Sequence, residues 1–188
     1  RLAQTPSSTV LDVNEMIVGS RGFWRDANRV SPHQVLTNPP RFAAFLGSVA
    51  SSTALFAPWR FTGSDAPTST VSPVSTISVP YGGSYSVRWL YDESKNAYRR
   101  AQSGRPVTRS FVYAANVVVL KTDAQTLDDK GRLRLRTTGS GEMVLYRDGR
   151  KFIGRWSRAA GDMMRFTGTY GADFELRPGA TWIEVTTD

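Results

Sequence analysis

The sequence contains no cysteine and a single histidine, His33. Without cysteine the chain has no disulfide, no thiol nucleophile, no cysteine-based zinc site and no thioether-linked haem. A single histidine also excludes a histidine-rich metal centre. We therefore expect no bound metal and no other cofactor.

Long apolar runs are absent too. No stretch reaches the about 18 apolar residues that a membrane-spanning helix needs, and the first residues, Arg1 to Gln4, do not resemble an apolar signal segment. A leader or lipid anchor would therefore lie outside this sequence. The 188 residues suffice for one domain or two small ones, and a composition with 40% hydrophobic and 21% charged residues is that of a folded globular protein.

Acidic residues are scarce in one region of a chain whose net charge is +8. Between Lys130 and Arg165 ten basic residues face three acidic ones, which accounts for most of the excess. Such a region favours a polyanionic partner, for which binding would weaken steeply with salt. The alternative is a solvated basic face that mainly confers solubility.

The first third of the chain carries one clear helix signal. Asn38 can cap a helix that starts at Pro39 and Pro40, where missing N–H groups cost nothing. The helical spacing of its apolar residues gives one buried stripe: Phe42, Phe45, Leu46 and Val49. The polar, proline-interrupted stretch 63–75 predicts a linker or long loop. We therefore expect an N-terminal segment over 1–62 and a β-rich C-terminal domain over 76–188.

From Ile77 onward the apolar residues recur with a period of two, as in strands. The pattern predicts a hairpin across 84–101, a central strand within 111–120, and a tight turn at Asp148-Gly149. Alternation in 132–136 predicts a strand with Leu133 and Leu135 buried and arginines on the other face. The predicted fold class is α+β, mostly antiparallel β: a curved sheet or partly closed barrel of about eight strands, with one or two helices in the N-terminal segment.

Several short motifs follow one another in this chain: Trp89-Leu90-Tyr91-Asp92, Tyr98, Arg100, Gly104, Pro106, Asn116-Val117-Val118-Val119, Gly139-Ser140-Gly141, Asp148-Gly149, Trp156 and 176–183. In this order they resemble the C-terminal domain of the YerB-like family of bacterial lipoproteins. Upstream, Trp24-Arg25-Asp26, Arg29 and Pro32-His33 resemble the end of that family's N-terminal domain. The resemblance covers roughly Phe23 to Val185.

The resemblance implies an exported, extracytoplasmic protein of the cell envelope, membrane-anchored or secreted, and no particular reaction, because the family is uncharacterised. The chain departs from it at 107–110, where Val-Thr-Arg-Ser replaces the family's histidine and aspartate. Most of the family's N-terminal region is also missing, so the resemblance implies that 1–62 is the end of a truncated N-terminal α/β domain. The absent part of a precursor is then one expected partner.

His33 is the candidate for acid–base chemistry, with Asp26 orienting its imidazole and Arg25 and Arg29 nearby. The alternative is a structural histidine in a proline-fixed turn. No serine nucleophile motif and no well-placed carboxylate pair is present. Whether the chain is an enzyme stays open, and these observations favour a protein that is not an enzyme.

The hairpin residues Trp89, Tyr91 and Tyr98, with Arg88 and Arg100, suggest a stacking site for sugars or bases. Alternation along the strand instead favours a core position for Trp89 and Tyr91, with Arg88 and Arg100 on the opposite face. The expected ligand-binding set is Arg25, Arg29, Arg88, Tyr91, Tyr98, Arg100, Arg132, Arg134 and Arg136.

Three functions remain open from the sequence. The first is an envelope module that binds an anionic glycan, a wall polymer or a protein partner. The second is an envelope-acting enzyme using His33 with Asp26, and the third is an accessory subunit of a larger envelope complex. Nucleic acid is an unlikely ligand, because no helix-turn-helix, zinc-finger or RNA-recognition consensus is present.

Overall fold

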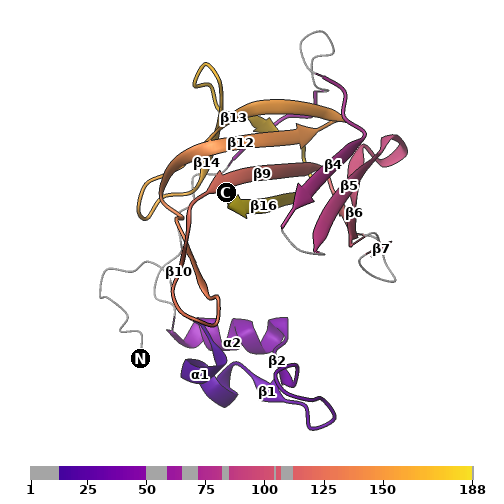
Figure 1. Ribbon diagram of the computed structural model, residues 1–188. Coiled ribbons are helices and arrows are strands. Elements are labelled where there is room, and N and C mark those ends of the chain that lie inside the picture. The colour runs from indigo at the N-terminus through magenta and orange to yellow at the C-terminus, as the bar shows by residue number, and fades with distance from the viewer. Residues whose placement is uncertain are drawn as a thin grey trace. The chain divides into compact units, whose positions relative to one another are not determined.

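The computed structural model describes residues 13–49, 59–64, 72–81, 85–103, 105–106 and 112–187 (Figure 1). The chain divides into two compact units, Arg1–Phe56 and Ala57–Asp188, and each is described by itself. The division predicted from the sequence stays a prediction, and residues 65–71 of its linker, like the 107–110 loop, lie outside the described residues. Among those residues no helix is long and apolar enough to span a bilayer.

The first unit contains two helices and a two-stranded ribbon. Its elements are α1 (Glu15–Val18), η1 (Gly19–Arg21), β1 (Trp24–Arg25), β2 (Val35–Leu36) and α2 (Pro39–Val49), and β1 pairs antiparallel with β2. The Asn38 side chain accepts a hydrogen bond from the Arg41 N–H at 2.9 Å, which confirms the predicted helix cap. Phe45 from α2 is buried, as is Val18 from α1.

The second unit is built from strands. Two are short and lie early: β3 (Arg60–Phe61) and β4 (Thr76–Pro80). The hairpin region contains β5 (Ser86–Asp92), η2 (Glu93–Lys95), β6 (Ala97–Gln102), β7 (Arg105–Pro106) and β8 (Tyr113–Ala114). The rest are β9 (Asn116–Thr122), β10 (Ala124–Thr126), β11 (Leu133–Leu135), β12 (Gly139–Arg147), β13 (Arg150–Arg158), β14 (Arg165–Gly168), β15 (Glu175–Leu176) and β16 (Thr181–Thr187).

These strands form two five-stranded sheets and two smaller pairs. The first sheet has the order β14-β13-β12-β9-β16, and the second has the order β4-β5-β6-β7 with β8 also paired to β6. The pairs are β10-β11 and β15-β3. Only β16-β9 and β15-β3 are parallel among the described pairings, so the predicted α+β class with mostly antiparallel strands is confirmed.

Strand β9 separates two hydrophobic cores. Its residue Val117 packs in a cluster with Trp89 and Tyr98 of the second sheet, whereas the next residue, Val118, packs with Trp156 on the other face. Being buried on both faces explains why β9 reads as an unbroken apolar run in the sequence. The second sheet therefore covers one face of the first sheet at one end.

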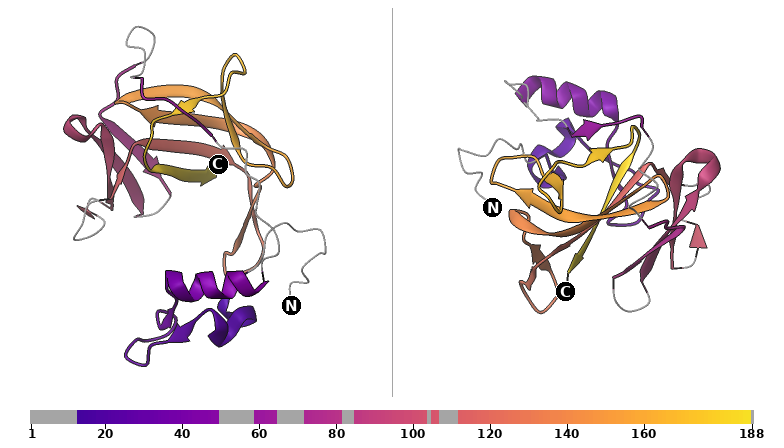
Figure 2. Two further views of the ribbon diagram at one scale, coloured as in Figure 1. Left: turned by 180° about the vertical axis from the view of Figure 1, so that it is seen from behind. Right: turned by 90° about the horizontal axis from the view of Figure 1, so that it is seen from above.

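The β12–β13 turn marks that end, and the β10–β11 ribbon marks the other. Asp148 and Gly149 both have positive φ, 53° and 66°, as a two-residue type I′ hairpin requires, so the predicted turn is confirmed. The β10–β11 ribbon joins β9 to β12 at the far end of the first sheet (Figures 1 and 2).

The prediction that Leu133 and Leu135 are buried is wrong. They are 55% and 39% exposed, because among the described strands β11 pairs only with β10, and this ribbon joins neither five-stranded sheet. The alternation was read correctly as a strand, but an alternating pattern indicates two faces without saying that either one is packed.

Candidate functional site

The strand register brings Arg100 to the same face as Trp89. The two residues are direct partners in the β5–β6 pair, and directly opposed residues of an antiparallel pair project to one side. The prediction that Arg100 points away from Trp89 is therefore wrong, and only Arg88 lies on the exposed face. Reading each strand's alternation separately could not reveal this, because the register depends on the length of the turn between them.

Glu184 of β16 is the centre of the buried cluster around Trp89. Its side chain is 5% exposed. Its carboxylate accepts a hydrogen bond from the Trp89 indole N–H at 2.9 Å and another from the Tyr81 hydroxyl, and it lies 3.5 Å from the Arg100 Nε atom. Three different segments thus converge on one carboxylate, which receives two hydrogen bonds and one ion pair that offset the cost of its burial.

The Arg100 guanidinium lies beside two tryptophan rings that also contact each other. Its Cζ atom lies 5.0 Å from the Trp182 ring centre and 5.9 Å from that of Trp89. The two rings are 5.4 Å apart and tilted by 59°. Gln102 accepts a hydrogen bond from the Arg100 Nη1 atom at 3.1 Å. Cation–π contacts and the Glu184 carboxylate together compensate for taking this charge out of water.

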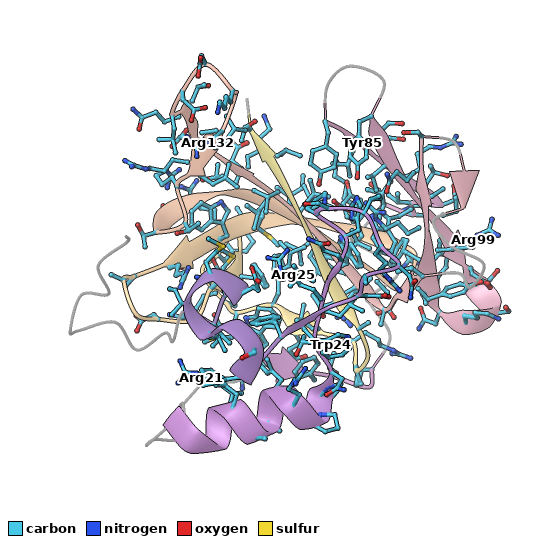
Figure 3. All side chains as sticks on the ribbon, turned by 90° about the horizontal axis from the view of Figure 1, so that it is seen from below. Arg21, Trp24, Arg25, Tyr85, Arg99 and Arg132 are labelled. Atoms are coloured by element: carbon cyan, nitrogen blue, oxygen red, sulfur yellow. The ribbon has the colours of Figure 1, made fainter. Side chains whose placement is uncertain are left out.

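Three aromatic side chains form an accessible rim on this buried cluster. Tyr81, Tyr85 and Trp182 are 37%, 42% and 38% exposed. The Tyr81 and Tyr85 rings are 5.6 Å apart, and Tyr85 is labelled at the start of β5 in Figure 3. We call Tyr81, Tyr85 and Trp182 the aromatic rim. Partial burial raises the pKa of Tyr81, and its hydrogen bond to the Glu184 carboxylate raises it further.

A separate groove has residues of β4 and β16 in its lining. Its volume is about 380 Å³, and its lining comes from four strands: Ser78, Val79, Val119, Lys121, Glu142, Met143, Val144, Thr186 and Thr187. Thr186 lies two residues beyond Glu184, and Val79 lies two residues before Tyr81. The groove therefore lies further along the two segments that carry Tyr81 and Trp182.

The other hairpin residues in the predicted binding set are mostly structural. Tyr98 is fully buried and offers no surface to a ligand. Tyr91 is half-buried and donates a hydrogen bond to the Asn96 side chain at 2.8 Å. Asn96 in turn donates to Asp148 at 2.9 Å, which fixes the hairpin of the second sheet to the β12–β13 turn. The core position predicted for Trp89 is confirmed by its zero exposure.

The arginines of the ribbon lie far from this cluster (Figure 3, where Arg132 is labelled). Arg132 forms an ion pair with Asp128, and Arg136 forms one with Asp123 at 2.5 Å. The carboxylates that neutralise them come from just before the basic stretch in the sequence. Arg134 projects from β11 and is exposed. The net positive charge around the ribbon is therefore smaller than the count of charged residues between Lys130 and Arg165 suggests.

The residues predicted for acid–base chemistry lie in the first unit. His33 is exposed, and its backbone N–H donates to the Val30 carbonyl at 2.9 Å. The Asp26 carboxylate accepts hydrogen bonds from Asn28 N–H at 3.0 Å and from Arg29 Nε at 3.2 Å. These contacts form a turn, and no hydrogen bond from the His33 side chain to Asp26 is among those described. Arg25 forms an ion pair with Glu15 at 2.7 Å.

Sequence reasoning missed Glu184, Trp182 and Tyr81. One signal was available: Trp182, Glu184 and Thr186 alternate with apolar Ile183 and Val185, as in a strand with one polar face. Nothing local indicated that this face meets Trp89, because β16 lies beside β9 in a parallel pairing across 65 residues of sequence. The buried partner of Arg100 could be found only from the fold.

Comparisons with known proteins agree with this fold. Residues 77–183, more than half of the chain, match the family model described as the C-terminal domain of a protein of unknown function, DUF3048. The crystal structure of the YerB protein from Bacillus subtilis is similar with a TM-score of 0.76 and 20% sequence identity, covering 94% of this chain and 60% of that one. No curated protein matches the chain. The chain thus spans little more than half the length of that relative, and it belongs to the YerB-like DUF3048 family.

Proposed function

We propose that the chain is an extracytoplasmic binding module of the cell envelope, and that it binds a wall glycan through the aromatic rim. The observation that carries the proposal is the rim itself: three partly exposed rings, Tyr81, Tyr85 and Trp182, of which Tyr81 and Trp182 contact the buried pair Glu184 and Arg100. The resemblance to a family of bacterial lipoproteins supports the envelope location.

The rim has the properties that a sugar-binding surface needs. The faces of a pyranose ring that carry C–H groups pack on aromatic rings, and Trp and Tyr offer a large contact area at little cost in conformational entropy. The buried hydrogen bond from Tyr81 to Glu184 and the stacking of Trp182 on Arg100 hold two of the rings before any ligand arrives. Such pre-organisation reduces the entropy lost on binding.

The alternative ligand, an anionic polymer, would bind to the arginines in and beside the β10–β11 ribbon, namely Arg132, Arg134 and Arg136. Two of these three arginines already have carboxylate partners, so fewer cations remain for phosphates or carboxylates of a polymer. The two sites differ in their response to salt. Binding through the ribbon would weaken steeply with ionic strength, whereas stacking on the rim would change little.

The enzyme alternative, with His33 and Asp26, has less support, because the described contacts of the Asp26 carboxylate are with Asn28 and Arg29. The third alternative, an accessory subunit, predicts a protein partner for an exposed apolar surface, for which the leucines of the ribbon are candidates.

The first test is co-sedimentation of the purified chain with insoluble bacterial cell-wall material. We expect Trp182→Ala to weaken binding about tenfold or more, as for a central aromatic contact. Tyr170→Ala is the matched control, because Tyr170 is a fully exposed aromatic residue outside the rim.

Wild-type binding should persist at high salt, and Arg134→Ala should leave it unchanged. If binding is lost at high salt and in the Arg134→Ala variant, the binding site is the β10–β11 ribbon and not the rim. The absence of any binding to wall material would contradict the proposed function altogether.

A further inference from the structure

A further surface of the second unit lies along the free edge of β4. We propose that this edge takes up an extended segment of a partner protein, which adds a strand to the second sheet and covers the apolar floor beside it. The chemistry of the partner is an extended backbone with aliphatic side chains at alternate positions. This site is separate from the aromatic rim and does not depend on a glycan ligand.

Strand β4 lies at one end of its sheet and pairs with β5 alone among the described strands. The register fixes which of its backbone groups are left over. Ser75 accepts a hydrogen bond from the Tyr91 N–H at 2.9 Å, so the odd-numbered residues of this strand, such as Ile77, form the hydrogen bonds to β5. The N–H and C=O groups of Thr76 and Ser78 therefore point away from β5, toward the open edge.

The edge of β4 lacks the protection that other edges in this unit have. Natural proteins commonly place charged residues on exposed strand edges, which discourages pairing with other chains. β7, at the other end of the same sheet, contains Arg105, and β14, at one end of the first sheet, begins with Arg165. β4 (Thr76–Pro80) contains no charged residue. An uncharged edge with outward donors and acceptors is a template for another strand.

The groove of about 380 Å³ lies along this edge. Ser78 and Val79 both line it, although their side chains project to opposite faces of β4 and that of Val79 is buried in the core. What the two residues have in common at the groove is the backbone of the strand edge. A ligand in the groove therefore meets peptide N–H and C=O groups on the β4 side, whatever side chains flank them.

The floor of the groove is formed by the first sheet, and Figure 1 shows β4 running at a steep angle to β9 and β12. Val119 and Val144 are direct partners in the β9–β12 pair and line the groove, and Val144 is in turn the partner of Ile153 on β13. These three side chains form one apolar row. Ile153, at its outer end, is 66% exposed. A strand added beside β4, about 5 Å from it, would cross the floor over this row.

The edge and the floor together identify the occupant as an extended peptide. An extended backbone offers donors and acceptors in the same alternating order as the edge of β4. Its side chains would point alternately to the floor and away from it, so those above Val144 and Ile153 should be aliphatic. Lys121 and Glu142 add one charge of each sign to the lining, so the peptide needs no net charge.

A second copy of this chain fits the edge less well than a peptide. Antiparallel pairing of β4 with the β4 of another copy requires a two-fold axis perpendicular to the sheet, which places both first sheets on the same side. The first sheet already extends past the edge of β4 as the floor of the groove, so the two floors would collide. A single extended segment has room where a whole second unit does not.

The test begins with phage-displayed random peptides of about seven residues, slightly longer than a typical strand, selected on the purified chain. We expect the enriched sequences to carry aliphatic side chains at every second position. A synthetic copy of the most enriched peptide is then titrated by fluorescence anisotropy. Methylation of one alternate set of its backbone N–H groups should weaken binding about tenfold or more, and methylation of the other set should change it little, because only one set faces β4.

Two pairs of variants separate the edge and the floor from their surroundings. Ser78→Pro removes an outward N–H and breaks no hydrogen bond to β5, so the chain should fold and its peptide affinity should fall about tenfold or more. Ser78→Ala keeps the backbone and should bind as the wild type does. Ile153→Ser should weaken binding several-fold, and Leu133→Ser is its matched control, because Leu133 is a similarly exposed aliphatic residue on the β10–β11 ribbon. Urea unfolding of each variant checks that the fold is intact.

Amide hydrogen exchange reports on the edge of the unaltered chain. In the free chain the amides of Thr76 and Ser78 should exchange much faster than that of Ile77, and the bound peptide should protect them. Failure to enrich any peptide, or a peptide that binds Ser78→Pro as tightly as the wild type, would overturn the proposal. A chain that sediments as a dimer and becomes monomeric on Ser78→Pro would replace the peptide by a second copy. None of these outcomes bears on wall binding through the rim.

Discussion

The second unit presents arginine in two opposite settings. Arg100 is 8% exposed at its side chain and lies between Trp89, Trp182 and Glu184, whereas Arg132 is 74% exposed at its side chain and pairs with Asp128 near the tip of the ribbon. Both residues have another basic residue within two positions in the sequence, Arg99 for Arg100 and Arg134 for Arg132. Only the first is embedded in a network that spans two sheets.

The difference shows that the number of ion pairs says little about what holds this fold together. An exposed pair gains about 0–1 kcal/mol, because water screens it and both side chains lose freedom. A buried pair gains little relative to an apolar pair but is costly to break, because one charge is then left without a partner. Arg100 and Glu184 should therefore tolerate substitution far less well than Arg132 and Asp128.

The largest expected effect comes from breaking the buried pair. Glu184→Ala leaves the Arg100 charge, the Trp89 indole N–H and the Tyr81 hydroxyl without their acceptor. We expect the free energy of unfolding to fall by about 3–5 kcal/mol, measured by urea unfolding followed by tryptophan fluorescence. Glu184→Gln keeps an acceptor and should cost less.

The matched variant on the ribbon is Arg132→Ala, which should change the free energy of unfolding by less than about 1 kcal/mol. Equal losses for Glu184→Ala and Arg132→Ala would contradict the distinction between the two regions. Such a result would mean that the side chains around Glu184 are not packed together in solution.

Two glycines provide a second comparison with a smaller effect. Gly149 and Gly131 both have positive φ, 66° and 72°, so alanine strains either turn by about 1–2 kcal/mol. A Cβ atom at Gly149 would also lie 2.7 Å from the Tyr91 ring, whereas one at Gly131 meets nothing within 4 Å. We expect Gly149→Ala to cost about 1–3 kcal/mol more than Gly131→Ala, from overpacking.

Urea midpoints of the two alanine variants check this expectation. Because the strain from the positive φ is common to both, their difference reports the packing around Tyr91. If both variants lose the same stability, the β12–β13 turn is not packed against the hairpin of the second sheet.

Local patterns predicted the elements that depend only on neighbouring residues. The Asn38 cap, the Asp148-Gly149 turn and the apolar run of β9 are each recognisable within a few residues, because cap, turn and strand chemistry are local. The α+β class follows from them. The core position of Trp89 was likewise read from the period of one strand.

The errors concern relations between distant segments. Whether Leu133 is covered depends on which sheet β11 joins, and the face of Arg100 depends on the β5–β6 register. The importance of Glu184 depends on the parallel pairing of β16 with β9. Alternation in one strand defines two faces but does not say what packs on either of them, so the site around Glu184 required the structure.

The smallest expected effect concerns Tyr81 at alkaline pH. Partial burial and the Glu184 carboxylate, with Tyr85 nearby, raise the pKa of Tyr81 above that of an unfolded tyrosine, near 10. The folded chain then keeps the phenol proton at pH values where the unfolded chain loses it. The stabilisation is complete below about pH 10 and is lost as the pH rises through the folded-state pKa.

We expect Tyr81→Phe to lose about 1 kcal/mol at neutral pH, for one hydrogen bond, and to flatten part of the alkaline fall in stability. Burial also raises the pKa of Tyr98 and Tyr146, so some of the fall should remain. Arg132→Ala should not alter it, because arginine keeps its charge at these pH values. Urea midpoints between pH 8 and about 10.5 measure the slope, and a slope unchanged in Tyr81→Phe would show that the phenol does not donate to Glu184, leaving the rim without its anchor.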